Sequence, residues 1–563
     1  MKVLLTTMNA KFIHSCLALY ALKAFCPMFE SHISIREFTV NQERDFILRE
    51  IVQENPALIG FSCYIWNITQ TIALVKTLKN VLPDVIVVFG GPEVSFQPEE
   101  IFSACPLDVI VQGEGEQTFL ELLLHYVDGH GSLDQIWGAA YRSNAADIAG
   151  GIVVNNVREV MEPSRIHFPY QNGLEAFENR LIYYETARGC PFHCQYCLSG
   201  DRGGVRLLPL ERAYTELALF LEWRARQVKF VDRTFNCVKK HAMGIWQYLI
   251  EHDNGISRFH FEIAGDLLDD EEFELLAHAR PGFFQFEIGV QSTNPLIIQR
   301  VQRATNLDNL FENITTLRKM GNIHLHLDLI AGLPGEDYAS CKTSFNDVYR
   351  LGADQIQLGF LKLLKGAGLR DRAEQYGLVY DAAPPYEVLL TRQISFEELS
   401  RLKMIEEMTA VFYNSSLFVY TLRYLTEQFS TPFDFYEALS AYWVRNGYHR
   451  FSHSKFALFE ILAAFDNQKE IVLNLLKFDL FLHEREKSPP EWLVPHMNPE
   501  KKQRLKAILY ARYPDKAGKD LASSYHIEEF SFDISAWICG GKMQKRGITL
   551  IFDYENGGFT ECA

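Results

Sequence analysis

The chain has 563 residues, 48% of them apolar and 22% charged, which is too long for a single hydrophobic core and indicates two to four domains. Its formal net charge is −16 and its Lys and Arg residues form no long run, which argues against a protein that binds nucleic acid unaided. No stretch of about 18 uncharged apolar residues predicts a membrane span, and the first residues lack the charged leader and apolar block of a secretion signal. We therefore expect a cytoplasmic, multidomain protein without a membrane anchor.

Apolar strands alternate with helical patterns through the first 128 residues. Strands are predicted at 2–8, 32–38, 57–66, 85–91 and 107–113, and helices at 14–26, 68–83 and 116–129. Continuous runs of Val, Ile and Leu separated by helices are typical of a parallel sheet that is covered on both faces. Residues 1–128 are therefore predicted to form a doubly wound, Rossmann-like α/β domain, with its ligand site at the carboxyl ends of the strands.

The pattern loosens over residues 129–178, which are predicted to be a linker with a small hairpin, and the alternation then resumes. Strands are predicted at 181–189, 227–235, 258–267, 282–292, 322–336 and 354–364. About six β/α units in residues 179–384 indicate a complete or partial TIM-like (β/α)₆ barrel, with its active site at the carboxyl ends of the strands. Residues 385–563 are predicted to be a mainly helical C-terminal domain that ends in a β hairpin.

Three of the eleven cysteines, Cys190, Cys194 and Cys197, lie within eight positions as C-x₃-C-x₂-C after the first predicted barrel strand. Thiolate clusters suit zinc or iron and sulfur, but closed sites of both kinds take four ligands. His193 could complete a zinc site, Cys237 could contribute a fourth thiol from another loop, and the clustering could also arise without a metal. If three thiolates hold a four-iron cluster, one iron stays open for a substrate or cofactor, which favours a catalytic site.

The cysteine motif, with Tyr196 before its third cysteine and "ARGC" at its start, resembles the signature of the radical S-adenosylmethionine (SAM) enzymes. The preceding sheet domain, with "GGPE" at 90–93 and "GEGE" at 113–116, resembles the cobalamin-binding domain of the B12-dependent branch of that family. The resemblance covers residues 1 to about 380. The C-terminal domain resembles an uncharacterised extension of some members, which implies nothing about function. It either caps the barrel mouth and selects the substrate, or serves as an interaction or stability module.

The resemblance implies that Cys190, Cys194 and Cys197 hold a [4Fe–4S] cluster whose open iron binds the amino and carboxylate groups of SAM. The other implied SAM contacts are Tyr196, Asp232, Arg233, Thr234, Glu262, Glu287, Gln291, Ser292 and Arg303. Glu262 and Glu287 point into the barrel by the two-residue alternation of strands, and a salt bridge, for example to Arg303, is the alternative to a cofactor contact. "LIAGLPGE" (329–336) resembles the glycine-rich motif near the adenine, or it forms a simple turn.

For cobalamin, the resemblance implies contacts that depend largely on backbone and shape. The implied positions are Asn9, His14, Ser62, Tyr64, Gly90, Gly91, Pro92, Glu93, Gly113, Glu114, Gly115 and Glu116. Domains with a histidine ligand below the cobalt carry Asp-x-His-x-x-Gly after the first strand, and His14 lacks both the Asp and the Gly at those spacings. We therefore expect His14 to cap a helix or to contact the nucleotide tail. Tyr64 and Trp66 are predicted to pack on the corrin or in the core, and Gly90–Pro92 to allow close approach or an ordinary turn.

The function implied by the resemblance is a radical methyltransferase. One electron delivered to the cluster cleaves SAM to a 5′-deoxyadenosyl radical, which removes hydrogen from an unactivated carbon, and methylcobalamin, charged from a second SAM, supplies the methyl group. The alternatives are a cobalamin-dependent radical rearrangement or cyclisation, and a non-catalytic cobalamin- or cluster-binding sensor. The expected partners are a small-molecule or peptide substrate and a reductant such as flavodoxin or ferredoxin; the sequence alone assigns no catalytic side chain.

Overall fold

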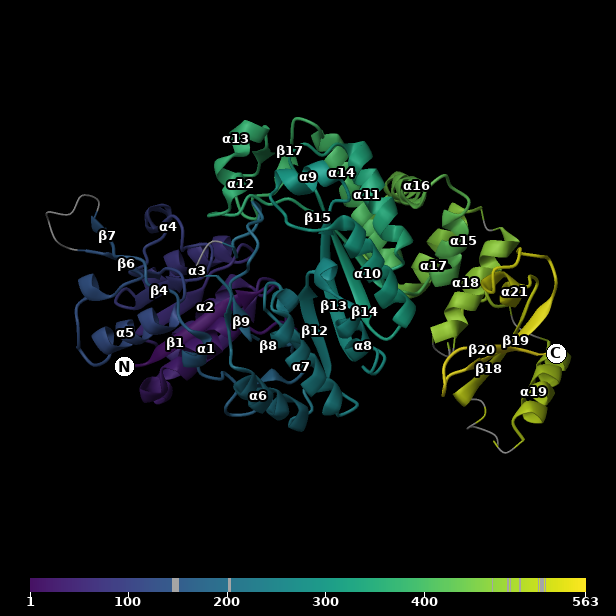
Figure 1. Ribbon diagram of the computed structural model, residues 1–563, viewed down its shortest axis with the longest axis horizontal. Coiled ribbons are helices and arrows are strands. Elements are labelled where there is room, and N and C mark those ends of the chain that lie inside the picture. The colour runs from purple at the N-terminus through teal and green to yellow at the C-terminus, as the bar shows by residue number, and fades with distance from the viewer. Residues whose placement is uncertain are drawn as a thin grey trace. The chain divides into compact units, whose positions relative to one another are not determined.

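The computed structural model describes residues 1–143, 151–200, 204–467, 469–483, 486, 488–495, 498–514, 516, 521 and 523–562 (Figure 1). The chain folds into two compact units. The first comprises Met1–Asp347, Leu351–Ala353 and Leu358–Leu399, and the second comprises Val348–Arg350, Asp354–Gln357 and the chain from Ser400 onward. None of the helices described there combines the length and the apolar content that crossing a membrane requires.

The N-terminal part of the first unit is built on a seven-stranded sheet in the order β2-β1-β3-β4-β5-β6-β7. Its parallel strands are β1 (Val3–Asn9), β2 (Ile33–Thr39), β3 (Leu58–Ser62), β4 (Ile86–Gly90) and β5 (Val109–Val111). The antiparallel strands β6 (Ala139–Arg142) and β7 (Ile152–Val154) extend this sheet, so part of the segment predicted to be a linker belongs to the sheet.

Helices cover both faces of this sheet, as the continuous apolar strands predict. The helices are α1 (Leu17–Phe25), α2 (Arg44–Glu54), α3 (Ile68–Val81), α4 (Pro98–Ala104) and α5 (Glu116–Tyr126). Leu4 and Val87 pack with residues of α2, α3 and α4 in one buried cluster, while Leu5 and Val88 pack with residues of α1 and α5 in another. Neighbouring residues of one strand therefore lie in opposite cores, which confirms the doubly wound arrangement.

A second, six-stranded sheet in the order β15-β14-β13-β12-β11-β8 follows. Its strands are β8 (Ile182–Tyr184), β11 (Gln227–Phe230), β12 (Arg258–Ile263), β13 (Phe284–Gln291), β14 (His324–Ala331) and β15 (Gln355–Phe360). The helices between them are α6 (Leu210–Glu222), α7 (Lys239–Glu251), α8 (Asp270–Leu276), α9 (Pro295–Arg300), α10 (Leu307–Met320) and α11 (Tyr338–Arg350). Because β8 and β15 form its two edges, the sheet is a partial barrel.

Every second residue of β13 and β14 is buried, and the residues between them are partly exposed. Phe284, Phe286 and Ile288 belong to the buried set, whereas Glu287 belongs to the partly exposed one. The chain thus places apolar side chains beneath the helices and polar side chains on the opposite face, which we call the inner face of the sheet.

Two short ribbons complete the unit: β9 (Ala187–Arg188) pairs with β10 (Arg206–Leu207), and β16 (Val379–Tyr380) pairs with β17 (Val388–Leu390).

The second unit is mainly helical and ends in antiparallel strands, as predicted. It contains most of α14 (Phe396–Met408) together with α15 (Val419–Thr426), α16 (Pro432–Arg445), α17 (Lys455–Phe465), α18 (Glu470–His483), α19 (Pro499–Arg512) and α21 (Ile534–Ile538). The predicted hairpin strands, β18 (Tyr525–Phe530) and β19 (Ile548–Asp553), pair with each other, and β20 (Phe559–Glu561) adds a third strand.

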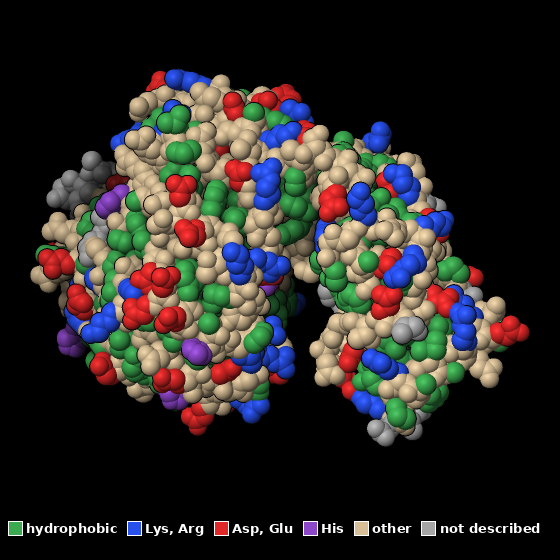
Figure 2. Space-filling view, turned by 45° about the vertical axis from the view of Figure 1, so that its right-hand side comes forward, with side chains coloured by type: hydrophobic (Ala, Val, Ile, Leu, Met, Phe, Trp, Pro, Cys, Tyr) green, Lys and Arg blue, Asp and Glu red, His purple; other side chains and the backbone are tan. Residues whose placement is uncertain are grey.

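The surface charge is mixed on the face that Figure 2 shows, where acidic and basic side chains alternate with apolar ones. This distribution agrees with the composition, in which acidic residues exceed basic ones by 16 without a long basic run.

Candidate functional site

The three clustered cysteines lie on the loop that follows β9, directly beside the turn after β11. The thiol of Cys190 is 3.4 Å from the hydroxyl of Thr234, and the backbone N–H of Cys197 donates to the carbonyl of Cys194 at 3.0 Å. Gly189 begins the loop with a φ of +90°, and a Cβ there would meet the carbonyl oxygen of Gly204 at 2.1 Å. Only glycine fits this approach, so the loop is held close to the β9–β10 ribbon.

Among the described residues, no three His, Cys, Asp or Glu side chains are arranged to hold a single metal ion. The ligands of a four-iron cluster bind separate irons, so the three thiols need not converge on one point. All three cysteines are free thiols, and none of them is fully buried. This donor set fits a cluster that three thiolates hold and that keeps one iron accessible.

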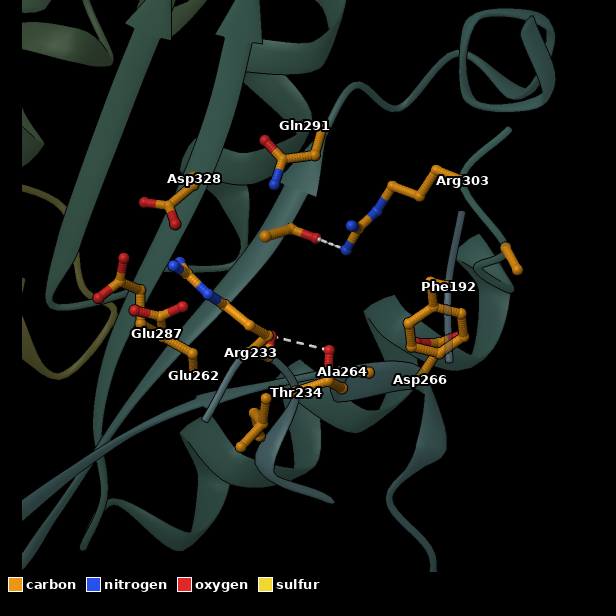
Figure 3. Close-up of a pocket in the computed structure, with 13 residues that line it drawn as sticks. Phe192, Arg233, Thr234, Glu262, Ala264, Asp266, Glu287, Gln291, Arg303 and Asp328 are labelled. Carbon is orange, nitrogen blue, oxygen red and sulfur yellow. Dashed lines mark hydrogen bonds between the residues drawn. The ribbon is translucent and has the colours of Figure 1, made fainter. Parts of the chain in front are cut away.

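A polar pocket lies beside the cysteine loop, on the inner face of the six-stranded sheet and toward the carboxyl ends of its strands (Figure 3). Six of the nine residues predicted to contact SAM line it: Arg233, Thr234, Glu262, Glu287, Gln291 and Arg303. Figure 3 shows Glu262, Glu287 and Asp328 on one side of the pocket and Arg303 with Phe192 on the other. The structure therefore brings together residues on or just after β11, β12, β13 and β14 with Phe192 of the cysteine loop.

Arg303 connects this pocket to the cysteine loop. Its guanidinium donates to the hydroxyl of Tyr196 at 3.3 Å and to the carbonyl of Gly289. Burial raises the pKa of the Cys194 thiol, and the nearby charge of Arg303 opposes that rise. The buried Nε of Arg303 has no hydrogen-bond partner among the residues that the structure describes. Tyr196 thus lies next to the pocket through Arg303, although it does not line it.

Gln291 has an unusual backbone at the end of β13. Its φ is +71°, a conformation that residues other than glycine rarely adopt, and the register between β13 and β14 shifts just before it. Its buried Oε1 has no hydrogen-bond partner within the described part of the chain. Backbone strain together with an unpartnered buried polar atom is characteristic of binding sites, because the missing partner is then a ligand.

The two inward carboxylates are paired with a lysine that the sequence argument did not name. Lys229 Nζ lies 2.9 Å from Glu287 and 3.4 Å from Glu262, and His260 Nε2 lies 3.0 Å from the same Glu287 oxygen. Although burial raises the pKa of Glu287, the donors on His260 and Lys229 outweigh burial and bring it to about 2. An interior salt bridge therefore exists, and it uses Lys229 where we had considered Arg303.

Asp232 and Ser292 were also predicted to contact SAM, and neither lines the pocket. Asp232 is 1% exposed and accepts from the backbone N–H of Thr186 at 2.7 Å and from the Thr186 hydroxyl. Burial raises the pKa of Asp232 to about 7. Ser292 donates to Glu336 at 2.6 Å, within the predicted glycine-rich motif. Both side chains hold strand ends together beneath the pocket.

The carboxyl edge of the N-terminal sheet carries the residues predicted to meet cobalamin. Tyr64 and Trp66 stack with ring centroids 4.4 Å apart, and Trp66 is 46% exposed. Gly91 has a φ of +109°, and a Cβ there would lie 2.5 Å from the carbonyl oxygen of Cys63. Ser62, which pairs with Gly90 in the sheet, is buried. A stacked aromatic pair with an exposed Trp66, beside a turn that requires glycine, fits a large, flat ligand placed against this edge.

His14 contacts the partial barrel through its side chain. Its Nδ1 is 2.7 Å from the hydroxyl of Tyr183 on β8, and the backbone N–H of Leu181 donates to Ile13 at 2.8 Å. Asn9 donates to the carbonyl of His14 at 3.0 Å and to Glu37 at 2.6 Å. His14 therefore connects the loop after β1 to the barrel, and Asn9 holds this loop against β2.

The acidic residues of "GGPE" and "GEGE" are likewise engaged within the protein. Glu93 is buried and accepts from the hydroxyl of Tyr386 at 2.8 Å. Glu116, at the start of α5, accepts from Arg188 at 2.5 Å. Glu114 accepts from Arg206 at 2.5 Å and lies 3.3 Å from Arg188. The remaining predicted positions lie in the same two turns: Pro92 in the turn after β4, and Gly113 and Gly115 in the turn between β5 and α5.

Comparison with known families agrees with this division of the chain. Residues 3–123 match the B12 binding domain, and residues 184–348 match the radical SAM superfamily. The chain therefore joins a B12-binding domain to a radical SAM domain. These matches confirm the predicted cofactor set of [4Fe–4S] cluster, SAM and cobalamin at the level of the two domain families. Residues 374–552 match a protein family of unknown function, DUF4080.

Two curated relatives are methyltransferases. The chain is 28% identical over 349 residues to the cobalamin-dependent radical SAM methyltransferase TokK of Streptomyces tokunonensis, covering 57% of this chain and 50% of TokK. It is 26% identical to the 2-(S-pantetheinyl)-carbapenam-3-carboxylate methyltransferase of Streptantibioticus cattleyicolor, covering 53% of this chain and 45% of that protein. The chain thus spans about half the length of these relatives.

A solved structure shares the fold over most of the chain. The cobalamin-dependent SAM radical enzyme OxsB, with aqua-cobalamin and SAM bound, superimposes with a TM-score of 0.57 at 15% identity. The match covers 92% of this chain and 82% of OxsB. It supports the architecture derived above, including the presence of a further region after the radical SAM domain.

Proposed function

We propose that the protein is a cobalamin-dependent radical SAM methyltransferase that moves a methyl group from SAM to an unactivated carbon of its substrate. The observation that carries this proposal is the free three-cysteine loop beside a polar pocket with unpartnered buried atoms, in one compact unit with a B12-binding domain. The methyltransferase relatives support methyl transfer over rearrangement or cyclisation. The substrate is a small molecule or peptide, and a flavodoxin- or ferredoxin-like protein supplies the electron.

The residues around the pocket take separate roles in this proposal. Cys190, Cys194 and Cys197 hold the cluster, and Tyr196 packs near the adenine next to Arg303. SAM contacts come from the pocket residues Arg233, Thr234, Glu262, Glu287, Gln291 and Arg303. Asp232 and Ser292 are better explained as supports, because each is buried and bonded to a neighbouring segment. When bound, the cluster and SAM supply the radical chemistry, while these side chains position SAM and exclude water.

Cobalamin binds at the carboxyl edge of the N-terminal sheet in this proposal. The stacked pair of Tyr64 and Trp66 and the close turn at Gly90–Pro92 provide its surface. His14 is not assigned as a cobalt ligand, because the sequence around it lacks the Asp and the Gly that accompany such a histidine. Glu93, Glu114 and Glu116 act indirectly, by holding the turns that carry them.

The test is anaerobic turnover of the reconstituted protein with iron, sulfide, hydroxocobalamin, SAM and a strong reductant. The proposal predicts both 5′-deoxyadenosine and S-adenosylhomocysteine by mass spectrometry, and neither product from the Cys194→Ala variant. Deoxyadenosine alone, with cobalamin bound, would favour a rearrangement or cyclisation. If the cluster-loaded protein gives neither product, the chain is a non-catalytic binding protein.

A further inference from the structure

The inner face of the partial barrel carries a set of titratable side chains that the cofactor assignments do not use. They are Lys229 on β11, His260 on β12, and His326 and Asp328 on β14. Asp328 lines the same pocket as Glu262 and Glu287, and Figure 3 shows the three carboxyl groups on one side of it. A pocket wall with three carboxyl groups in close proximity cannot easily keep all of them ionised.

Two of these carboxyl groups, Glu287 and Asp328, differ in the hydrogen-bond donors and cations that lie next to them. Lys229 Nζ donates to Glu287 Oε2 at 2.9 Å, and His260 Nε2 lies 3.0 Å from the same oxygen without hydrogen-bond geometry. Asp328 Oδ1 lies 3.2 Å from His326 Nε2 on its own strand, and this contact does not meet hydrogen-bond geometry. Glu287 therefore has a hydrogen-bonded cation that stabilises its charge, whereas the close contact of Asp328 is with a histidine and is not a hydrogen bond.

The surroundings of Asp328 favour its neutral form. Glu287 and Glu262 face it from β13 and β12, His324 and His326 lie on its own strand, and the cations are Lys229 on β11 and Arg303 in the loop after α9. Arg233 also lines the pocket and points toward this wall in Figure 3. Burial, followed by the charges of Glu287 and Glu262, raises the pKa of Asp328 to about 8. Burial also lowers the pKa of His326, so this imidazole stays neutral near pH 7.

We propose that Asp328 is a substrate-contacting acid: it keeps its proton beside the ionised Glu287 and donates a hydrogen bond to an acceptor atom of the substrate. Carboxyl groups that share a site but differ in partners divide into acid and anion in this way. The proposal rests on the proposed function, because it takes SAM to contact Glu262 and Glu287 and the substrate to reach Asp328 beside them. It implies a substrate with a carbonyl, carboxylate or comparable acceptor group next to the reacting carbon, and not a plain hydrocarbon.

Infrared difference spectra between about pH 6 and about pH 10 test the protonation directly and need no turnover. The protein is labelled with [4-¹³C]aspartate, and the Asp328→Asn spectrum is subtracted so that other buried aspartates, such as Asp232, cancel. We expect a protonated carboxyl band that titrates near pH 8 and belongs to Asp328. If subtraction leaves no such band at pH 6, the proposal is wrong. Asp266→Asn, which alters another carboxyl group of this pocket, is the matched control and should leave the band in place.

A second variant keeps Asp328 and tests its coupling to the neighbouring strand. Glu287→Gln removes the adjacent negative charge, so the titration midpoint of Asp328 should fall. An unchanged midpoint would contradict the proposed influence of ionised Glu287 on protonated Asp328. This test remains available if the Asp328→Asn protein fails to fold.

SAM affinity separates a substrate contact from a cofactor contact. Equilibrium dialysis of cluster-loaded protein should give a dissociation constant for Asp328→Asn within about twofold of that of the unmodified protein. A tenfold or larger loss would place Asp328 in the SAM site and overturn the proposal. If the unmodified protein bound no SAM, the proposed function would fail, and the infrared result would still decide the state of Asp328.

Discussion

Arg188 donates to Glu116 at 2.5 Å, which fixes the residue two positions before the first cluster cysteine to the start of α5 in the B12-binding domain. The arginine also lies 2.9 Å from Glu185 and 3.3 Å from Glu114. The Arg188 side chain is 13% exposed and that of Glu116 is 7% exposed, so this pair is largely removed from water. The cluster loop and the B12-binding domain are therefore joined by a buried ionic network.

Replacing Arg188 with Met should strongly destabilise the first unit. Removing one partner leaves buried carboxylates without compensation, which typically costs about 3–5 kcal/mol of unfolding free energy. Urea denaturation followed by tryptophan fluorescence measures this loss. Lys239→Met is the control, because Lys239 is 42% exposed and its pairs with Asp269 and Glu271 lie at the surface. Equal effects of the two variants would contradict the structural role of Arg188.

Gly91→Ala should damage the cobalamin edge more than a glycine change elsewhere. The added Cβ would lie 2.5 Å from the carbonyl oxygen of Cys63, so the turn after β4 must move. Gly131 also has a positive φ but has open space around it, so Gly131→Ala reports the cost of the backbone conformation alone, about 1–2 kcal/mol. We expect a larger loss for Gly91→Ala, together with reduced cobalamin retention after gel filtration. Full retention would place cobalamin away from this turn.

His14→Ala should leave the absorption spectrum of bound cob(III)alamin unchanged, because His14 lacks the neighbouring Asp and Gly of cobalt-binding histidines. Its Nδ1 lies 2.7 Å from the hydroxyl of Tyr183. Tyr183→Phe removes the same hydrogen bond from the other side and is the matched variant. Both changes should lower stability by a similar amount, about 1 kcal/mol for one hydrogen bond. A spectral shift seen only in His14→Ala would indicate that the imidazole binds cobalt.

His241 predicts a specific pH dependence of stability. This histidine is 4% exposed, its Nε2 lies 3.1 Å from the Thr186 hydroxyl, and burial lowers its pKa to about 4 from 6.5. Between these two pH values the unfolded chain binds a proton that the folded chain excludes. The unfolding free energy of the native protein relative to His241→Gln should therefore rise by about 1.4 kcal/mol per pH unit from about pH 4 to about pH 6.5, and stay level above. A flat difference across that range would show that folding does not lower the pKa of His241.

The sequence predicted the sheets, the cysteine loop and the pocket carboxylates because each depends on local periodicity or spacing. The two-residue alternation that selects Glu262 and Glu287 also selects Lys229, His260 and Asp328, which the family resemblance did not point to. The directions of the Asp232 and Ser292 side chains could not be predicted, because both residues follow the last residue of a strand and the two-residue alternation ends there. The Arg188–Glu116 pair joins residues 72 positions apart, and only tertiary structure brings such residues together.

The most direct test of the account is to follow a deuterated methyl group from SAM into the corrin. The reconstituted protein is incubated without oxygen with reductant and methyl-labelled SAM, and the extracted cobalamin is analysed by mass spectrometry. A cobalamin-dependent methyltransferase predicts a trideuteromethyl group on the corrin at near-stoichiometric amounts. Formation of 5′-deoxyadenosine with a corrin that carries no label would contradict methyl transfer.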